Sequence, residues 1–175
     1  MSRRLAGLAL YPSLIANLVI CRLLRIWNWW DQIGPLLFVG ARPFPSDVPR
    51  LYDLGVRAVV NTCEEYAGPV KTYSDYGIAQ LHLPTVDFTS PSLDDVKIAV
   101  AFIAENHKQD NAVYVHCKAG RGRSATIALC WLMQAHKCDP TDAFRRLQER
   151  RRQVSRNLAT RHVVQQFWES VSEGS

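Results

Sequence analysis

Between His116 and Ser124 the chain reads HCKAGRGRS, which places a cysteine, two glycines, two arginines and a serine within nine residues. Gly120 and Gly122 let the backbone curl around a tetrahedral anion without Cβ clashes. Arg123 offers a planar, permanently charged fork that matches two phosphate oxygens. The field that holds an anion also lowers the pKa of Cys117, so we expect a thiolate at neutral pH. These residues predict nucleophilic attack on phosphorus and a cysteinyl-phosphate intermediate.

The other residues of this stretch have predicted roles of their own. Ser124 follows the arginine, and its hydroxyl can hydrogen-bond the sulfur and ease the departure of the thiolate. We expect His116 to orient the loop through side-chain hydrogen bonds. The residues predicted to surround the phosphate are Lys118, Ala119, Gly120, Arg121, Gly122 and Arg123. The alternative, an ordinary loop with a buried cysteine, does not require these residue types together at these spacings.

The elements on either side of the stretch position it. A β-branched, apolar run at 111–116 predicts a buried strand, and the almost wholly apolar run at 124–135 predicts a buried helix. The loop therefore lies at the carboxyl end of a strand and at the amino end of a helix. Backbone N–H groups converge there, and the helix dipole favours an anion.

The rest of the chain predicts an α/β fold. Strands are expected at 36–40, 56–63 and 78–83, and helices after the caps Ser92 and Asp139 and at 158–171. Strands that alternate with helices predict a mainly parallel central sheet of about four to five strands flanked by helices.

The first thirty-three residues differ from residues 34–175, which we assign to the catalytic domain. They hold four arginines and no acid before Asp31, and residues 5–21 are uncharged. With tryptophans at 27, 29 and 30, this pattern is typical of a helix that lies in the membrane interface. Two alternatives stay open, a helix packed on the core with buried tryptophans and a targeting segment.

The charge of the chain limits the kinds of partner that it can bind. The net charge is +5, which indicates an anionic partner. Seven arginines accompany one acid at 145–161, which we interpret as a solvated helix face or, second, as a surface attracted to anionic lipid. No aromatic platform or groove-reading motif accompanies them, so we expect no nucleic acid.

The five cysteines include no CxxC pair, so we expect free thiols in a reducing compartment. Cys63 is either a buried small hydrophobe or the partner of a protective disulfide with Cys117 under oxidation. No HExxH, EF-hand or Walker pattern is present, and we expect no metal and no cofactor.

The pattern His-Cys-x5-Arg-Ser resembles the signature of the cysteine-dependent protein tyrosine phosphatase superfamily, and the short chain resembles its dual-specificity branch over about residues 36–170. A closer resemblance is to the mitochondrial lipid phosphatases of this superfamily that act on phosphatidylglycerophosphate. It rests on 117–124, on NTCEEY at 61–66, on TVDFT at 85–89, and on LYP at 10–12 with WWDQI at 29–33.

The resemblance implies a loop aspartate as general acid, and Asp87 occupies the matching loop. The same carboxyl would later activate water. Asp94 and Asp95 compete for this role, although their place in the first turn of a helix suits the helix dipole. Glu64, Glu65 and Tyr66 either rim the pocket or form a solvated loop, and similar residues occur in the lipid phosphatases.

The resemblance also implies a substrate and a location. Lys118 and Arg121 favour a substrate with more negative charge than one phosphomonoester, as in an anionic phospholipid, or else they steer anions in general. We expect phosphatidylglycerophosphate; the alternatives are phosphoproteins and phosphoinositides. The expected place is a membrane surface, either the matrix side of the mitochondrial inner membrane in a eukaryote or the cytoplasmic face of the plasma membrane in a bacterium.

Overall fold

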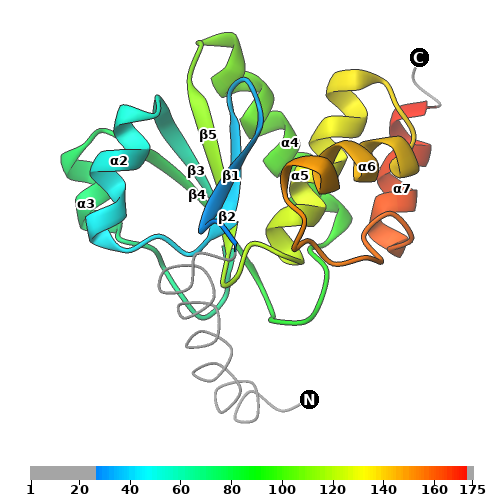
Figure 1. The fold of residues 1–175 in the computed structure, drawn as a ribbon, viewed down its shortest axis with the longest axis horizontal. Coiled ribbons are helices and arrows are strands. Elements are labelled where there is room, and N and C mark those ends of the chain that lie inside the picture. Colours follow the sequence, from blue (N-terminus) through cyan, green and yellow to red (C-terminus); the bar gives the residue numbers. More distant parts are fainter. Residues whose placement is uncertain (1–26, 173–175) are drawn as a thin grey trace.

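The computed structural model describes residues 27–172, which form a five-stranded sheet with helices on both faces (Figure 1). The strands are β1 (Trp30–Gly34), β2 (Leu37–Ala41), β3 (Val56–Cys63), β4 (Ala79–Thr85) and β5 (Ala112–Cys117). The helices are the short 3-10 turn η2 (Pro45–Asp47), α2 (Val48–Asp53), α3 (Val70–Asp75), α4 (Leu93–Lys108), α5 (Arg123–His136), α6 (Pro140–Arg150) and α7 (His162–Ser172). The mainly parallel α/β fold predicted from the sequence is confirmed.

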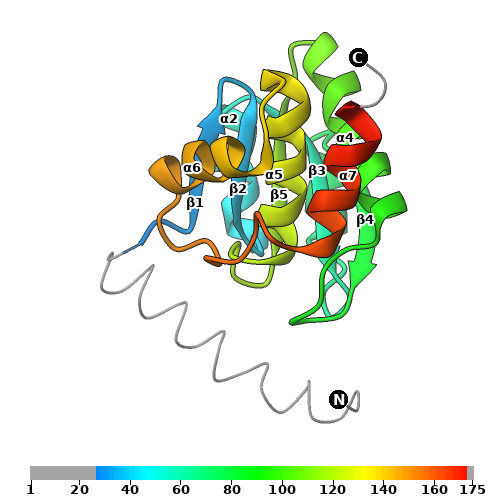
Figure 2. The ribbon, with the colours of Figure 1, turned by 90° about the vertical axis from the view of Figure 1, so that its right-hand side faces the viewer.

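The strand order β1-β2-β5-β3-β4 places β5 at the centre of the sheet. All pairs are parallel except β1 with β2, which are antiparallel. Every residue of β5 is buried, as expected for a strand covered on both faces. The loops that follow β4 and β5 extend from the same end of the molecule (Figure 2), where a parallel α/β sheet places its ligands.

Two apolar cores lie on the two faces of the sheet. Helices α4, α5, α6 and α7 cover one face, and α2 and α3 cover the other (Figure 1). The larger core joins Val113 and Val115 of β5 to residues of α4 to α7 such as Leu129 and Phe167. The smaller core joins Tyr114 of the same strand to Leu51 of α2 and to other residues. Side chains along β5 point alternately into the two cores, so the strand that carries Cys117 is packed on both faces.

The predicted helix starts have the expected caps. The Ser92 hydroxyl accepts a hydrogen bond from the Asp95 backbone N–H at 3.1 Å. The Asp139 carboxylate accepts hydrogen bonds from the N–H groups of Thr141 and Asp142 at 2.8 and 3.0 Å, with Pro140 in the first helical position. Both caps satisfy backbone donors that the helix leaves unpaired.

The tryptophan-rich segment differs from the expectation. Trp30–Gly34 is the edge strand β1, so the predicted boundary after residue 33 falls inside a strand of the catalytic domain. Trp29 is buried and stacks on Phe44, and Trp30 packs edge-on against Tyr114. The prediction that Trp29 and Trp30 belong to a helix in the membrane interface is therefore wrong, because Trp29 is buried in the domain and Trp30 is a partly buried residue of β1.

The predicted membrane-associating segment lies, up to residue 26, outside the described residues. Within residues 27–172, no helix combines the length and the apolar character that a membrane span requires.

Candidate active site

The loop from Cys117 to Arg123 joins the central strand β5 to the buried helix α5. Gly120 has a φ of 67°, a conformation that side chains rarely adopt. A Cβ atom at Gly120 would also meet the backbone of Gly40, in the neighbouring strand β2. The glycine therefore allows the loop to turn tightly against the neighbouring strand.

Hydrogen-bond donors converge on the Cys117 sulfur. The Gly120 backbone N–H lies 3.2 Å from Sγ, and the Ser124 hydroxyl donates to Sγ over 3.3 Å. Burial opposes ionisation of the Cys117 thiol, but the Arg123 charge and hydrogen bonds from Ser124 and the loop backbone outweigh it, so its pKa is lowered. The structure thus brings together the groups that a nucleophilic thiolate requires.

Arg123 is held in place from several sides. Glu65 accepts two hydrogen bonds from its guanidinium, at 2.7 and 2.8 Å, and the Thr85 carbonyl accepts another at 2.8 Å. Burial works against the charge, but Glu65 and the sulfur of Cys117 raise the pKa of Arg123. Burial likewise disfavours the Glu65 carboxylate, but Arg123 outweighs it and lowers that pKa. Glu65 therefore orients the phosphate-binding arginine.

Asp87 reaches the same guanidinium from the loop that follows β4. Its carboxylate lies 2.9 Å from Arg123 Nη2, and it also forms an ion pair with Lys118. Within the loop itself, Asp87 Oδ1 also accepts a hydrogen bond from the Phe88 backbone N–H at 3.1 Å. The structure therefore brings the candidate general acid to the arginine and lysine of the phosphate loop.

The competing acids lie elsewhere. Asp95 accepts a hydrogen bond from the Ser92 hydroxyl at 2.7 Å, within the first turn of α4. Asp94 is an exposed residue of the same turn. Their contacts suit the cap and dipole of the helix rather than proton transfer.

His116 does not orient the loop as expected. Its ring is fully buried, and neither ring nitrogen has a hydrogen-bond partner within residues 27–172. Burial lowers its pKa to about 3, so the ring is neutral. It stacks on Tyr114, with ring centroids 5.6 Å apart, and its carbonyl accepts a hydrogen bond from Thr62 at 3.0 Å. The expectation of side-chain hydrogen bonds is wrong; the ring supports the strand by packing.

Arg121 and Tyr66, two other candidate site residues, contact residues outside the loop of Cys117 to Arg123. The Arg121 side chain donates to the Gln153 carbonyl at 2.9 Å and lies over the Trp27 ring. The Tyr66 hydroxyl donates to the Pro43 carbonyl at 2.5 Å. Glu64 is exposed at the end of β3. Of the acids at positions 64 and 65, Glu65 forms the ion pair with the Arg123 guanidinium.

Cys63 has a different environment from Cys117. Burial raises the pKa of its thiol, so it is protonated at neutral pH. Both cysteines are free in the structure. Within residues 27–172, no group of three or more His, Cys, Asp or Glu side chains is placed to hold a metal ion.

The arginine-rich run contains residues that the sequence pattern misassigned. Arg151 is buried and Arg161 is half-buried, so the run is not one solvated face. Arg151 hydrogen-bonds the phosphate-loop carbonyls of Ala119 and Gly120. A sequence run of arginines does not show which of them is buried, so the burial of Arg151 is visible only in the tertiary structure.

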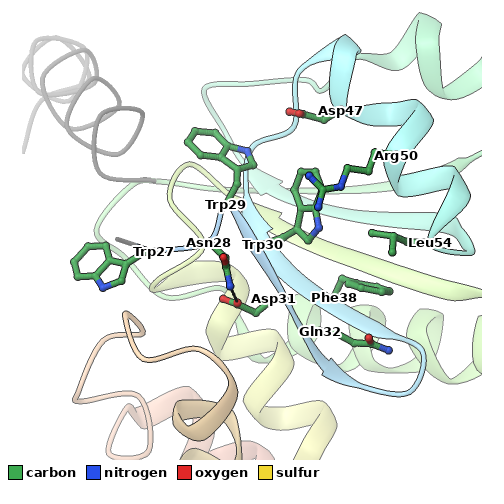
Figure 3. A pocket seen from close by; sticks show the side chains of 10 residues that line it. All are labelled: Trp27, Asn28, Trp29, Trp30, Asp31, Gln32, Phe38, Asp47, Arg50 and Leu54. Carbon is green, nitrogen blue, oxygen red and sulfur yellow. Dashed lines mark hydrogen bonds between the residues drawn. The ribbon is translucent and has the colours of Figure 1, made fainter. Parts of the chain in front are cut away.

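A cavity of about 760 Å³ lies beside β1, lined by residues that include Trp27, Trp30, Asp31, Arg50 and Leu54 (Figure 3). None of its lining residues belongs to the loop of Cys117 to Arg123. The candidate active site lies instead at the end of β5, where the Cys117 sulfur, the Arg123 guanidinium and the Asp87 carboxylate come together.

Comparison with known proteins agrees with this geometry. Residues 37–170 match the model of the dual specificity phosphatase catalytic domain. The chain is 42% identical over 160 residues to the phosphatidylglycerophosphate phosphatase PTPMT2 of Arabidopsis thaliana, covering 90% of this chain and 70% of the relative. It is 34% identical over 179 residues to the human phosphatidylglycerophosphatase and protein-tyrosine phosphatase 1, covering 96% and 88%.

A solved structure of PTPMT1 in complex with PI(5)P superposes with a TM-score of 0.78 at 31% identity, covering 84% of this chain and 99% of that one. Cys117, Arg123 and Asp87, the candidate nucleophile, phosphate-binding residue and acid, thus lie within the matched catalytic domain. The chain belongs to the dual specificity phosphatase family and is a cysteine-dependent phosphatase.

Proposed function

We propose that this enzyme hydrolyses the phosphomonoester of phosphatidylglycerophosphate and releases phosphatidylglycerol and inorganic phosphate. The observation that carries the proposal is the pairing of a Cys117–Arg123–Asp87 site with relatives named for this activity along 90% and 96% of the chain.

In the first step, Cys117 Sγ attacks phosphorus and the bond from phosphorus to the ester oxygen breaks. Arg123 and the loop N–H groups bind the three non-bridging oxygens, where charge is concentrated in the transition state. The incoming phosphate displaces Asp87 from Arg123 and Lys118, and the freed carboxylate takes up a proton from solvent as the substrate binds. Asp87 then donates this proton to the departing alkoxide as the ester bond breaks.

In the second step, water attacks the cysteinyl phosphate and the sulfur–phosphorus bond breaks. Asp87 accepts the proton from water, and the products are inorganic phosphate and the thiolate. The Ser124 hydroxyl, 3.3 Å from Sγ, stabilises the charge that returns to the sulfur. Each residue therefore returns to its starting protonation state at the end of the cycle.

The rim of the site supports a lipid substrate. Val86 and Phe88 flank Asp87 and leave 48% and 70% of their surface exposed. Phe88 has a φ of 66°, a strained conformation for a bulky residue. Apolar side chains held outward beside the acid suit the glycerol and acyl portion of a phospholipid, since contact with it removes them from water. Lys118 adds a second cation beside Arg123, which suits a substrate that also carries a phosphodiester.

A membrane surface follows as the proposed place of action, because this substrate resides in a bilayer. In a eukaryotic cell we place the enzyme on the matrix side of the mitochondrial inner membrane, and in a bacterium on the cytoplasmic face of the plasma membrane. Residues 1–26 supply basic and apolar side chains of the kind that bind such surfaces.

The complex of a related enzyme with PI(5)P makes a phosphoinositide the second candidate substrate. The deciding experiment measures phosphate release by the full chain from phosphatidylglycerophosphate, phosphoinositides and phosphopeptides, with the lipids in mixed micelles at equal surface concentration. We expect the highest kcat/KM for phosphatidylglycerophosphate. Higher kcat/KM for a phosphoinositide or a phosphopeptide would reject this substrate while leaving the cysteine mechanism intact.

A further inference from the structure

Three consecutive carbonyls of the phosphate loop are bound from outside by one segment that follows α6. The Gly120 carbonyl accepts from Arg151 Nε at 2.7 Å, and the Ala119 carbonyl accepts from Arg151 Nη2 at 3.2 Å. The Arg121 carbonyl accepts from the Ser155 backbone N–H at 2.9 Å. The segment 151–155 thus forms an outer brace along the loop.

The outer brace determines where the loop N–H groups point. In a trans peptide the C=O and the following N–H point in opposite directions. A carbonyl held outward at Ala119 therefore turns the Gly120 N–H inward, and this N–H is observed 3.2 Å from the Cys117 sulfur. The same geometry at Gly120 and Arg121 turns the next two N–H groups toward the anion site.

Arg151 is itself fixed by the edge strand. Its side chain is 1% exposed, and its Nη1 forms an ion pair with Asp31 at 2.5 Å. Asp31 is 11% exposed and also accepts a hydrogen bond from the exposed Asn28 side chain at 2.7 Å. Figure 3 shows Asn28 and Asp31 turned toward each other, away from Trp30 and Arg50. A buried guanidinium requires such partners, and here they are the Asp31 carboxylate, the Asn28 carbonyl and the loop itself.

We propose that Arg151, held by Asp31, is a positioning residue for catalysis: it orients the backbone N–H donors of the phosphate loop toward the Cys117 thiolate and the transferring phosphoryl group. The proposal rests on the phosphatase chemistry of the site and is independent of the lipid. Its neighbours Arg150 and Arg152 are exposed, so the role falls to one arginine of the run.

The test compares Arg151→Gln, Arg151→Lys and Asp31→Asn with the wild-type full chain. A soluble aryl phosphate replaces the lipid, so that failure of the substrate assignment cannot affect the result. The readouts are kcat and KM, inhibition by orthovanadate, and the pH dependence of Cys117 alkylation by iodoacetamide. Arg145→Gln is the matched control, because Arg145 lies exposed on α6 and pairs with Asp142 and Glu149.

We expect Arg151→Gln to lower kcat about tenfold or more, as loss of transition-state donors does, with weaker vanadate inhibition. The alkylation midpoint of Cys117 should move to higher pH, because misdirected N–H groups no longer favour the thiolate. Arg151→Lys should recover part of both, since an ammonium binds one carbonyl but not two. Asp31→Asn should change both in the same direction, and Arg145→Gln should change neither.

A fall in melting temperature with wild-type kcat and an unchanged alkylation midpoint in Arg151→Gln would overturn the proposal and leave Arg151 a structural residue. If Arg151→Gln does not fold, Arg151→Lys and Asp31→Asn decide the question. Unchanged kcat and midpoint in both of those variants would overturn it equally.

Discussion

The floor and the rim of the active site are built differently. The floor consists of Cys117, Arg123 and Ser124, which are 4%, 2% and 0% exposed and lie where the central strand meets a buried helix. The rim consists of the loop after β4, where Phe88 is 70% exposed and has a positive φ. Asp87 extends from this loop to the floor. Under the proposed function, the floor performs a reaction common to all phosphomonoesters, whereas the rim selects the substrate.

If this division holds, a change in the floor affects every substrate alike. Arg123→Lys should lower kcat/KM about a thousandfold for the lipid and for a soluble aryl phosphate, because an ammonium cannot replace the fork that binds two oxygens. Steady-state kinetics on both substrates measures the effect. Arg145→Lys on the surface of α6 is the matched control. A loss confined to one substrate would contradict the division.

Asp87 lies between the floor and the rim, and the fall in kcat when it is replaced should depend on the leaving group of the substrate. Asp87→Asn should lower kcat about a hundredfold for phosphatidylglycerophosphate, whose alkoxide needs a proton, and much less for an aryl phosphate with an acidic phenol. Asp94→Asn, on the first turn of α4, is the control. An equal loss on both esters, or normal turnover of the lipid, would remove Asp87 from the acid role.

The floor also predicts a pH dependence. Because the pKa of Cys117 is lowered, kcat/KM should rise with pH through a midpoint below that of an ordinary thiol. Ser124→Ala removes a hydrogen bond that favours the thiolate, so the midpoint should move to higher pH and kcat should fall about tenfold. Profiles of kcat/KM against pH for both proteins test this. A midpoint that stays in place would show that Ser124 does not stabilise the sulfur charge.

The smallest effect should come from the rim. Phe88→Ala should lower kcat/KM a few-fold for phosphatidylglycerophosphate in mixed micelles, because one apolar contact with the lipid is lost. The soluble aryl phosphate should be hydrolysed at the wild-type rate. The control is Ile98→Ala, since Ile98 is exposed on α4 away from this loop. Equal losses on both substrates would mean that Phe88 shapes the floor rather than contacts lipid.

The floor was largely predictable from the sequence, because it is contiguous. Strand, glycine loop and helix follow one another from Ala112 to His136, so local spacing encodes their geometry. Asp87 could be chosen among three acids only through the family resemblance, since no local pattern shows that the loop after β4 returns to Arg123.

The parts that were missed depend on tertiary contacts. The edge strand β1 pairs with β2. The sequence did not indicate this strand, because its residues follow an apolar, tryptophan-rich stretch that is typical of a membrane-interface helix. Arg151 lies among exposed arginines and is distinguished only by its burial against Asp31 and the loop. His116 is a polar residue next to the nucleophile, yet its ring serves the packing of β5.

Under the proposed mechanism, Cys117 accepts the phosphoryl group of phosphatidylglycerophosphate in a covalent intermediate. The most direct measurement is rapid acid quench of the enzyme with substrate labelled in its phosphomonoester, followed by peptide mapping. We expect label on the Cys117 peptide within one turnover in the wild type. Cys117→Ser should show neither label nor turnover, and Cys138→Ser should retain both. Phosphate release without label on Cys117, or turnover by Cys117→Ser, would contradict it.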